Sequence, residues 1–145
     1  MMKVYAFIHP ELNILCCALL PEAVPEGIEA VELEVESPDD VVYDGTQIRL
    51  KTQDERLQEL KAQKLSELKT YVAGLLARTD YVITKIVEAQ IRNNIAEVEA
   101  LKQRYSAQLQ QREAIRAWNE RMKQKIRNAT SLEELKAIEI RFEGV

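Results

Sequence analysis

Residues Lys64 to Leu76 read KLSELKTYVAGLL, and this stretch decides the class of the fold. Its apolar residues recur at intervals of about three and four: Leu65, Leu68, Val72 and Leu75. That spacing places them along one face of an α-helix, in the pattern of a coiled-coil seam. We expect the helix to cover residues 53–78 and to end at a break over Arg78-Thr79-Asp80.

More helix is predicted on the C-terminal side of this stretch. Residues 81–92 are too apolar for a linker and predict a second helix. A long third helix is expected over residues 95–128, about 50 Å in length at 1.5 Å per residue. Ser131 and Glu134 have the spacing of a capping box, which predicts a last helix over residues 131–140.

The sequence before residue 50 has a different pattern, that of short strands and turns. Lys3–Ile8 and Ile14–Leu20 are apolar runs separated by a turn, which predicts a hairpin. Residues Val31 to Val35 alternate between apolar and acidic, as in a strand with one buried face. Asp44-Gly45 lies between apolar runs, the strongest short-range hairpin signal. The predicted class is therefore α+β, a small N-terminal antiparallel β meander followed by long C-terminal helices in a hairpin or coiled-coil-like arrangement.

The distribution of charge and of proline places a boundary near residue 50. All four prolines precede residue 39, and residues 1–50 hold two basic and ten acidic side chains, a net charge of −8. Residues 51–145 hold the remaining 18 basic and 14 acidic side chains, a net charge of +4. We therefore expect a β-rich head over residues 1–50 and a helical region over residues 51–145.

The sequence lacks the residue patterns that most classes of enzyme and cofactor-binding protein need. The single histidine, His9, lies in a predicted turn, and the adjacent Cys16 and Cys17 point to opposite faces of a strand. The four glycines are scattered, so no phosphate-cradling loop is present. No apolar run of about 18 residues or signal peptide is found. We expect a cytoplasmic protein that is not an enzyme and has no catalytic residues, cofactor or metal.

The apolar helix faces are the candidate binding surface. A head of this size has a thin core, and the helix faces exceed what one hairpin seam covers. We expect a homo-oligomer, dimer or trimer, formed through the helices. The same residues could instead pack against each other in an antiparallel helix hairpin, leaving only a remainder for a partner. The candidates are Leu65, Leu68, Val72, Leu75, Ile95, Val98, Leu101 and Tyr105.

A basic stripe is the second candidate surface. Its residues share one side of the long third helix: Arg112, Arg116, Lys123 and Arg127. A basic helical stripe can bind nucleic acid. The whole chain is acidic, with an isoelectric point near 5.2, so a solvated or internally paired face is the stronger interpretation.

Three segments together resemble a known family. They are VVYDGTQIRLKT from Val41, RLQELKAQKLSELK from Arg56 and LLARTDYVITKIVEA from Leu75. Their order resembles small proteins encoded by tailed bacteriophages and prophages beside tail-fibre genes, several of which resemble tail-fibre assembly chaperones. A Tyr-Asp-Gly turn and a Thr-Asp-aromatic motif carry the resemblance, at Tyr43-Asp44-Gly45 and Thr79-Asp80-Tyr81.

The resemblance implies a role in protein–protein binding. A chaperone of this kind would hold a fibre protein's trimerising end until assembly, in the host cytoplasm. The alternative is a structural tail or baseplate component that oligomerises through its helices and is associated with the virion. A nucleic-acid-binding regulator is the weaker alternative, and no membrane partner is expected.

Overall fold

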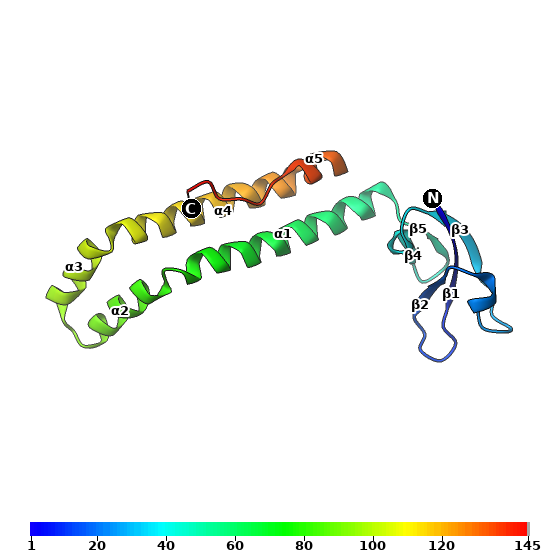
Figure 1. Ribbon diagram of the computed structural model, residues 1–145, viewed down its shortest axis with the longest axis horizontal. Helices are drawn as coiled ribbons and strands as arrows, with labels where there is room; N and C mark the ends of the chain where they lie inside the picture. Colours follow the sequence, from blue (N-terminus) through cyan, green and yellow to red (C-terminus); the bar gives the residue numbers. More distant parts are fainter. Residues whose placement is uncertain (145) are drawn as a thin grey trace. The chain divides into compact units, whose positions relative to one another are not determined.

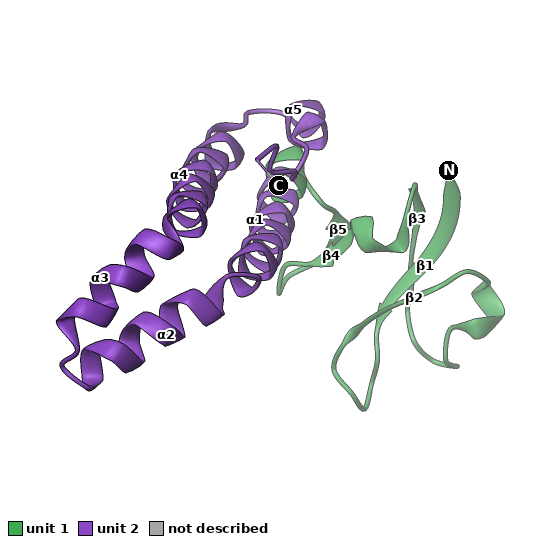
Figure 2. Cartoon of the chain, turned by 60° about the vertical axis from the view of Figure 1, so that its left-hand side comes forward, with its two compact units in different colours: residues 1–56 green, residues 57–145 purple. Residues whose placement is uncertain are grey.

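The computed structural model describes residues 1–144 and confirms the α+β class, with strands first and long helices after them (Figure 1). The chain divides into two compact units, Met1–Arg56 and the residues from Leu57 onward (Figure 2). The division lies after Arg56, and ion pairs join the first turn of helix α1 (Gln53–Ala77) to the strands of the first unit. Arg49 Nη1 lies 2.6 Å from Glu55 Oε1, and Arg56 Nη2 lies 3.9 Å from Asp40 Oδ1.

The first unit contains a three-stranded antiparallel sheet with the order β2-β1-β3. Its strands are β1 (Met2–Ile8), β2 (Leu15–Ala18) and β3 (Val31–Val35). The predicted first hairpin is confirmed, since Ile8 pairs with Leu15 across β1 and β2. Short 3₁₀ turns at Pro21–Ala23 and Pro38–Asp40 connect the strands. A small core fills one side of the sheet, formed by Val4, Ala6, Val35 and Val41.

The Asp-Gly hairpin is also confirmed. Strands β4 (Val41–Tyr43) and β5 (Ile48–Leu50) pair with Tyr43 opposite Ile48. Gly45 has a φ of +90°, which a residue without a side chain adopts at no steric cost. Asp44 Oδ1 accepts hydrogen bonds of 2.9 Å from the backbone N–H groups of Thr46 and Gln47 and so closes the turn.

The second unit is an antiparallel helix hairpin. Its first arm is α1 followed by α2 (Asp80–Ile91), and its second arm is α3 (Ile95–Arg104) followed by α4 (Ser106–Asn128) (Figure 1). The predicted break between α1 and α2 is confirmed. The chain reverses without proline or glycine, because Asn93 adopts a φ of +56° and Asn94 Oδ1 caps α3 by accepting from Glu97 N at 3.1 Å.

The prediction of one continuous helix over residues 95–128 is wrong, because Tyr105 separates α3 from α4. Its backbone has φ −106° and ψ 23°, outside the α-helical range. The first arm breaks at Thr79, and the buried Tyr105 ring packs edge-on against Tyr81 just beyond that break, with the ring centroids 5.7 Å apart. The two arms are therefore interrupted next to each other, the first at Thr79 and the second at Tyr105.

The last helix is also shorter than predicted. Helix α5 (Leu132–Ala137) starts at the predicted cap, where Ser131 Oγ accepts from Glu134 N at 3.1 Å, but it ends before Ile138. Residues 138–144 are not helical. Ile138, Ile140 and Phe142 alternate with charged residues, a period of two that lets an extended chain place its apolar side chains against the helices.

Two apolar clusters hold the hairpin together. The larger lies between α1, α4, α5 and the residues after α5, and it contains Leu68, Val72, Leu75, Ile115, Met122, Ile126, Ala129, Leu135 and Ile138. The smaller lies between α2 and α3 and contains Val82, Ile86, Ala89, Val98 and Tyr105. Among the described residues, no helix combines the length and apolar character needed to cross a membrane.

Candidate protein-binding groove

An apolar groove of about 410 Å³ lies along the pairing of α1 and α4. Helix α1 contributes Leu65, Leu68, Lys69, Val72, Ala73 and Leu76, and helix α4 contributes Asn119, Lys123 and Arg127. The apolar side chains form the floor, and the charged side chains lie among the polar residues that complete the lining. Leu68 and Val72 belong to the larger cluster, so the groove is an opening onto the core of the hairpin.

The groove occupies only one flank of the α1–α4 seam. On α1, successive residues turn by about 100°, so Leu65, Lys69 and Leu76 lie on one side of the buried seam. Lys64 and Tyr71 lie on the other side. On α4, Asn119, Lys123 and Arg127 share the groove side, whereas Gln111, Trp118 and Lys125 share the opposite side.

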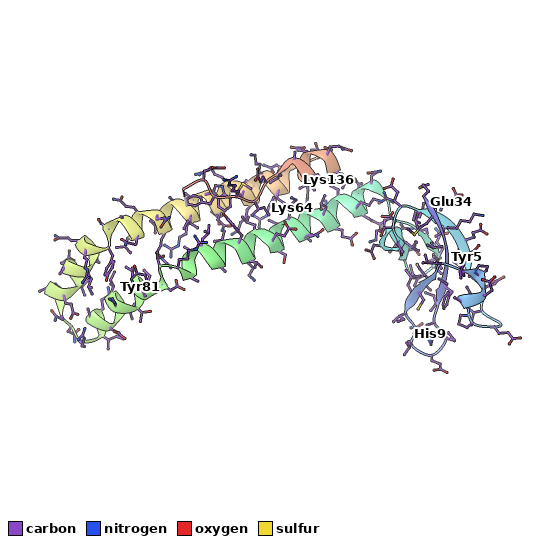
Figure 3. All side chains as sticks on the ribbon, in the orientation of Figure 1. Tyr5, His9, Glu34, Lys64, Tyr81 and Lys136 are labelled. Carbon is purple, nitrogen blue, oxygen red and sulfur yellow. The ribbon has the colours of Figure 1, made fainter. Side chains whose placement is uncertain are left out.

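The opposite flank is covered by the residues that follow α5. Lys64 Nζ donates to the carbonyl oxygen of Ile138 over 2.9 Å, and Phe142 N donates to the Tyr71 hydroxyl over 3.0 Å. Figure 3 labels Lys64, the α1 residue of the first of these contacts. The rings of Trp118 and Phe142 lie 5.5 Å apart between centroids. We call residues 138–144 the C-terminal strap. It closes one flank of the seam and leaves the groove flank open.

The lining of the groove carries positive charge and no carboxylate. Its cations are Lys69, Lys123 and Arg127. Lys123 Nζ lies 2.8 Å from Glu120 Oε1, outside the lining, and this hydrogen bond and charge lower the pKa of Glu120. An exposed ion pair of this kind is weak, because water screens the two charges. Lys123 is therefore readily redirected towards a bound carboxylate.

The predicted binding residues divide into buried and exposed groups. Three are buried in the larger cluster (Leu68, Val72 and Leu75), and two in the smaller cluster (Val98 and Tyr105). Leu65 and Leu101 are half-buried against them. Ile95 is 77% exposed at the tip of the hairpin. Most of the predicted surface is thus an internal seam, while Leu65, Leu68 and Val72 also line the groove.

The predicted basic face needs a correction at Arg112. Its side chain is buried, and Nη1 lies 2.8 Å from the carbonyl oxygen of Leu76 and 3.0 Å from Asp80 Oδ1. A buried, paired guanidinium is not available to a nucleic acid. Arg116 Nη1 is also paired, 2.7 Å from Glu113 Oε1 at the surface. Lys123 and Arg127 remain, and they border an apolar groove.

The sequence reasoning missed several groove residues: Lys69, Ala73, Leu76 and Asn119. A signal for them was present in the adjacent Leu75 and Leu76. Two helices pack through a narrow a/d stripe, and Leu76 with Leu65 widens the apolar face of α1 beyond that stripe. A face wider than the seam indicates that a third element can pack there.

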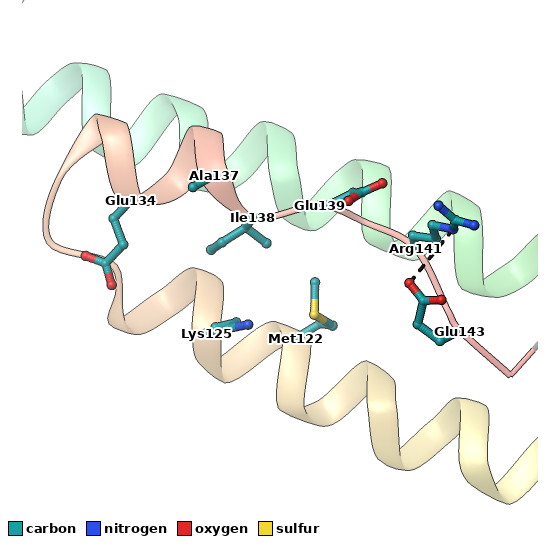
Figure 4. A pocket seen from close by; sticks show the side chains of 8 residues that line it. All are labelled: Met122, Lys125, Glu134, Ala137, Ile138, Glu139, Arg141 and Glu143. Carbon is teal, nitrogen blue, oxygen red and sulfur yellow. Dashed lines mark ion pairs between the residues drawn. The ribbon is translucent and has the colours of Figure 1, made fainter.

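Other hollows have less chemical definition, among them an open one of about 530 Å³ between α4 and the end of the C-terminal strap at Phe142 and Gly144. One of about 390 Å³ lies between α4, α5 and the C-terminal strap, with Met122 and Ile138 at its base and charged residues of both signs around it (Figure 4). Another, of about 240 Å³, lies at the hairpin tip beside Ile95. No group of three or more His, Cys, Asp or Glu side chains in residues 1–144 is placed to hold a metal ion. His9 Nδ1 accepts from Glu11 N and Leu12 N, so it is engaged in its own turn.

The chain matches no protein-family profile, no curated protein and no solved structure.

Proposed function

We propose that this protein is an assembly factor for a bacteriophage tail-fibre protein and acts by binding a segment of that protein. The open apolar groove between α1 and α4 is the observation that carries the proposal. Apolar surface in contact with water is costly, at about 25 cal/mol for each Å². Leu65 and Leu76 are half-buried in the lining, so a partner that covers them removes apolar surface from water and lowers the free energy.

The sequence motifs supply the identity of the partner in this proposal. Tyr43-Asp44-Gly45 and Thr79-Asp80-Tyr81 resemble elements of small proteins encoded beside tail-fibre genes. A chaperone must hold an aggregation-prone end and later release it. An open groove on a pre-formed hairpin suits this task, because binding requires no unfolding of the chaperone.

The experiment removes the gene from a phage or prophage that encodes the chain. We expect the fibre protein to become insoluble and to be missing from purified particles, whereas particles made with the chain carry fibres. Mass spectrometry of those particles should find no stoichiometric amount of the chain itself. Normal fibres in the absence of the chain would contradict the proposal.

The second candidate is a structural tail or baseplate component. The exposed apolar tip of the hairpin favours it, since Ile91 and Ile95 are 74% and 77% exposed and could pack against another copy. The same mass spectrometry separates the two candidates. A component is present in finished particles at a fixed ratio to the other tail proteins.

A further inference from the structure

We propose that the groove binds an amphipathic helix of about three turns from another protein, with acidic side chains beside its apolar stripe. This inference depends on the proposed function, because it names the chemistry of the segment that the assembly factor holds. Its evidence is the length of the groove, the charge of its lining and the composition of the segment that covers the opposite flank of the same helices.

The length of the groove matches a short helix. Its lining on α1 runs from Leu65 to Leu76, about 16 Å at a rise of 1.5 Å per residue. Three turns of an α-helix have that length. Two antiparallel helices present a furrow that takes a third helix, the usual geometry of a helical bundle. Helix α5 is an example in this chain, since its Leu135 is buried in the larger cluster.

The charge of the lining selects an acidic occupant. Lys69, Lys123 and Arg127 lie around an apolar floor with no carboxylate among the lining residues. A helix with leucine-like side chains in the floor places its flanking residues against these cations. Acidic flanking residues form charge-assisted hydrogen bonds there, whereas basic ones are repelled.

The covered flank shows the same chemistry within this chain. Residues 132–143 combine buried apolar side chains with four acidic and two basic ones, and they cover α1 and α4 on that side. The hollow there is lined by Glu134, Glu139 and Glu143 of this segment together with Lys125 of α4, and Glu143 lies 3.9 Å from Arg141 of the same segment (Figure 4). An acidic, apolar segment is therefore what these two helices already bind on one flank.

A second copy of the chain fits the groove less well. A two-fold symmetric pairing through the groove would bring the same three cations of both copies together. Like charges across an interface oppose association. The occupant that the lining selects is an acidic segment of a different protein.

The test uses the full-length protein and two labelled synthetic peptides of about 14 residues, long enough for three turns and their ends. Both carry leucine at the same helical positions. One has glutamate and the other lysine at the flanking positions. Fluorescence anisotropy should show the acidic peptide binding about tenfold more tightly. Residues 51–145 carry a net charge of +4, so non-specific attraction also favours the acidic peptide. The charge-reversal variants separate that attraction from binding in the groove.

Charge reversal and groove filling give matched controls. Lys69→Glu combined with Arg127→Glu should remove the preference for the acidic peptide. Arg121→Glu combined with Lys136→Glu makes the same change in net charge away from the groove and should leave the preference intact. Ala73→Phe should block binding by filling the groove, and Ala117→Phe, another exposed alanine, should not.

The proposal is overturned if the basic peptide binds as well as the acidic one, if neither binds, or if the Lys69 and Arg127 changes have no more effect than their control. Self-association abolished by Ala73→Phe would identify a second copy as the occupant and also overturn it. This test can fail independently of the test of the proposed function. Loss of fibres when the chain is absent, together with no peptide preference, supports the assembly role and contradicts the binding of an acidic helix in the groove. A clear peptide preference, together with normal fibres when the chain is absent, supports binding in the groove and contradicts the assembly role.

Discussion

Arg112 of α4 and Thr79 between α1 and α2 meet in the interior of the hairpin, where Arg112 Nη1 donates to Thr79 Oγ1 over 2.9 Å. The same nitrogen donates to the carbonyl oxygen of Leu76 in the last turn of α1 over 2.8 Å. One side chain of the second arm thus satisfies backbone and side-chain acceptors where the first arm breaks. The Arg112 side chain therefore sets how the second arm is aligned along the first.

Replacing Arg112 should therefore destabilise the hairpin. Arg112→Met keeps much of the apolar stem but removes the donor to Thr79 Oγ1 and one of the donors to the Leu76 carbonyl, which still accepts from Thr79 N. We expect a loss of about 1–3 kcal/mol in the free energy of unfolding, measured by urea denaturation. Arg116→Met, at an exposed ion pair on the same helix, should change it by less than about 0.5 kcal/mol. Equal stability of the two variants would contradict this role for Arg112.

Leu68 and Ile95 should differ sharply, although both belong to the predicted binding set. Leu68 is 1% exposed in the larger cluster, so Leu68→Ala should cost about 2–5 kcal/mol of stability. Ile95 is at the exposed tip, and Ile95→Ala should cost less than about 0.5 kcal/mol. Thermal or urea unfolding measures both. A cost below about 1 kcal/mol for Leu68→Ala would mean that the seam is not packed in solution.

Phe142 should report the docking of the C-terminal strap. Its ring packs against Trp118, the single tryptophan, whose ring also meets Tyr71 at a centroid distance of 5.8 Å. Phe142→Ala removes this cover, and we expect the tryptophan emission to move to longer wavelength as water reaches the indole. Arg141→Ala, an exposed neighbour, is the control and should leave the spectrum unchanged. An unshifted spectrum in Phe142→Ala would mean that the strap is undocked in solution.

The stability of the β4–β5 hairpin should depend on pH through the carboxyl group of Asp44. Hydrogen bonds from Gln47 N and Thr46 N, followed by that from Arg49, lower the pKa of its carboxyl from 3.8 to about 2. A lowered pKa means that the contribution to stability is present above pH 3.8 and is lost as the pH falls towards about 2. Carboxyl-carbon NMR should show Asp44 titrating near pH 2, and Arg49→Gln should raise that midpoint. Titration of Asp44 at its ordinary pKa would show that the turn is open in solution.

The expected homo-oligomer stays a prediction, and the hairpin tip is where we expect it to form. Ile91 and Ile95 lie on either side of the chain reversal and are both largely exposed. Light scattering at micromolar concentration should give a dimer or trimer of the 16.7 kDa chain. Ile91→Glu combined with Ile95→Glu should lower the mass to that of the monomer, since charge at an apolar contact opposes association. A monomeric wild-type protein would refute this expectation.

Local sequence determined the elements of this fold. Asp44-Gly45 specified a hairpin, because a residue without a side chain can take the positive φ that the turn requires. The spacing of Leu65, Leu68 and Val72 specified a helix and the face that it buries. Ser131 and Glu134 located the start of α5 through their cap. Each of these signals acts between residues close in the chain, which is why the α+β class and most element bounds could be predicted.

Only the tertiary structure decided which surfaces are covered. Helical periodicity placed Arg112 on a stripe with Arg116, but its burial depends on acceptors at Leu76 and Thr79, more than thirty residues away. The strap closes one flank of the seam because Ile138 and Phe142 reach residues of α1 about seventy positions earlier. The groove is the flank that no such contact covers. A side chain's position on its helix follows from local geometry, whereas its exposure depends on what distant segments pack against it.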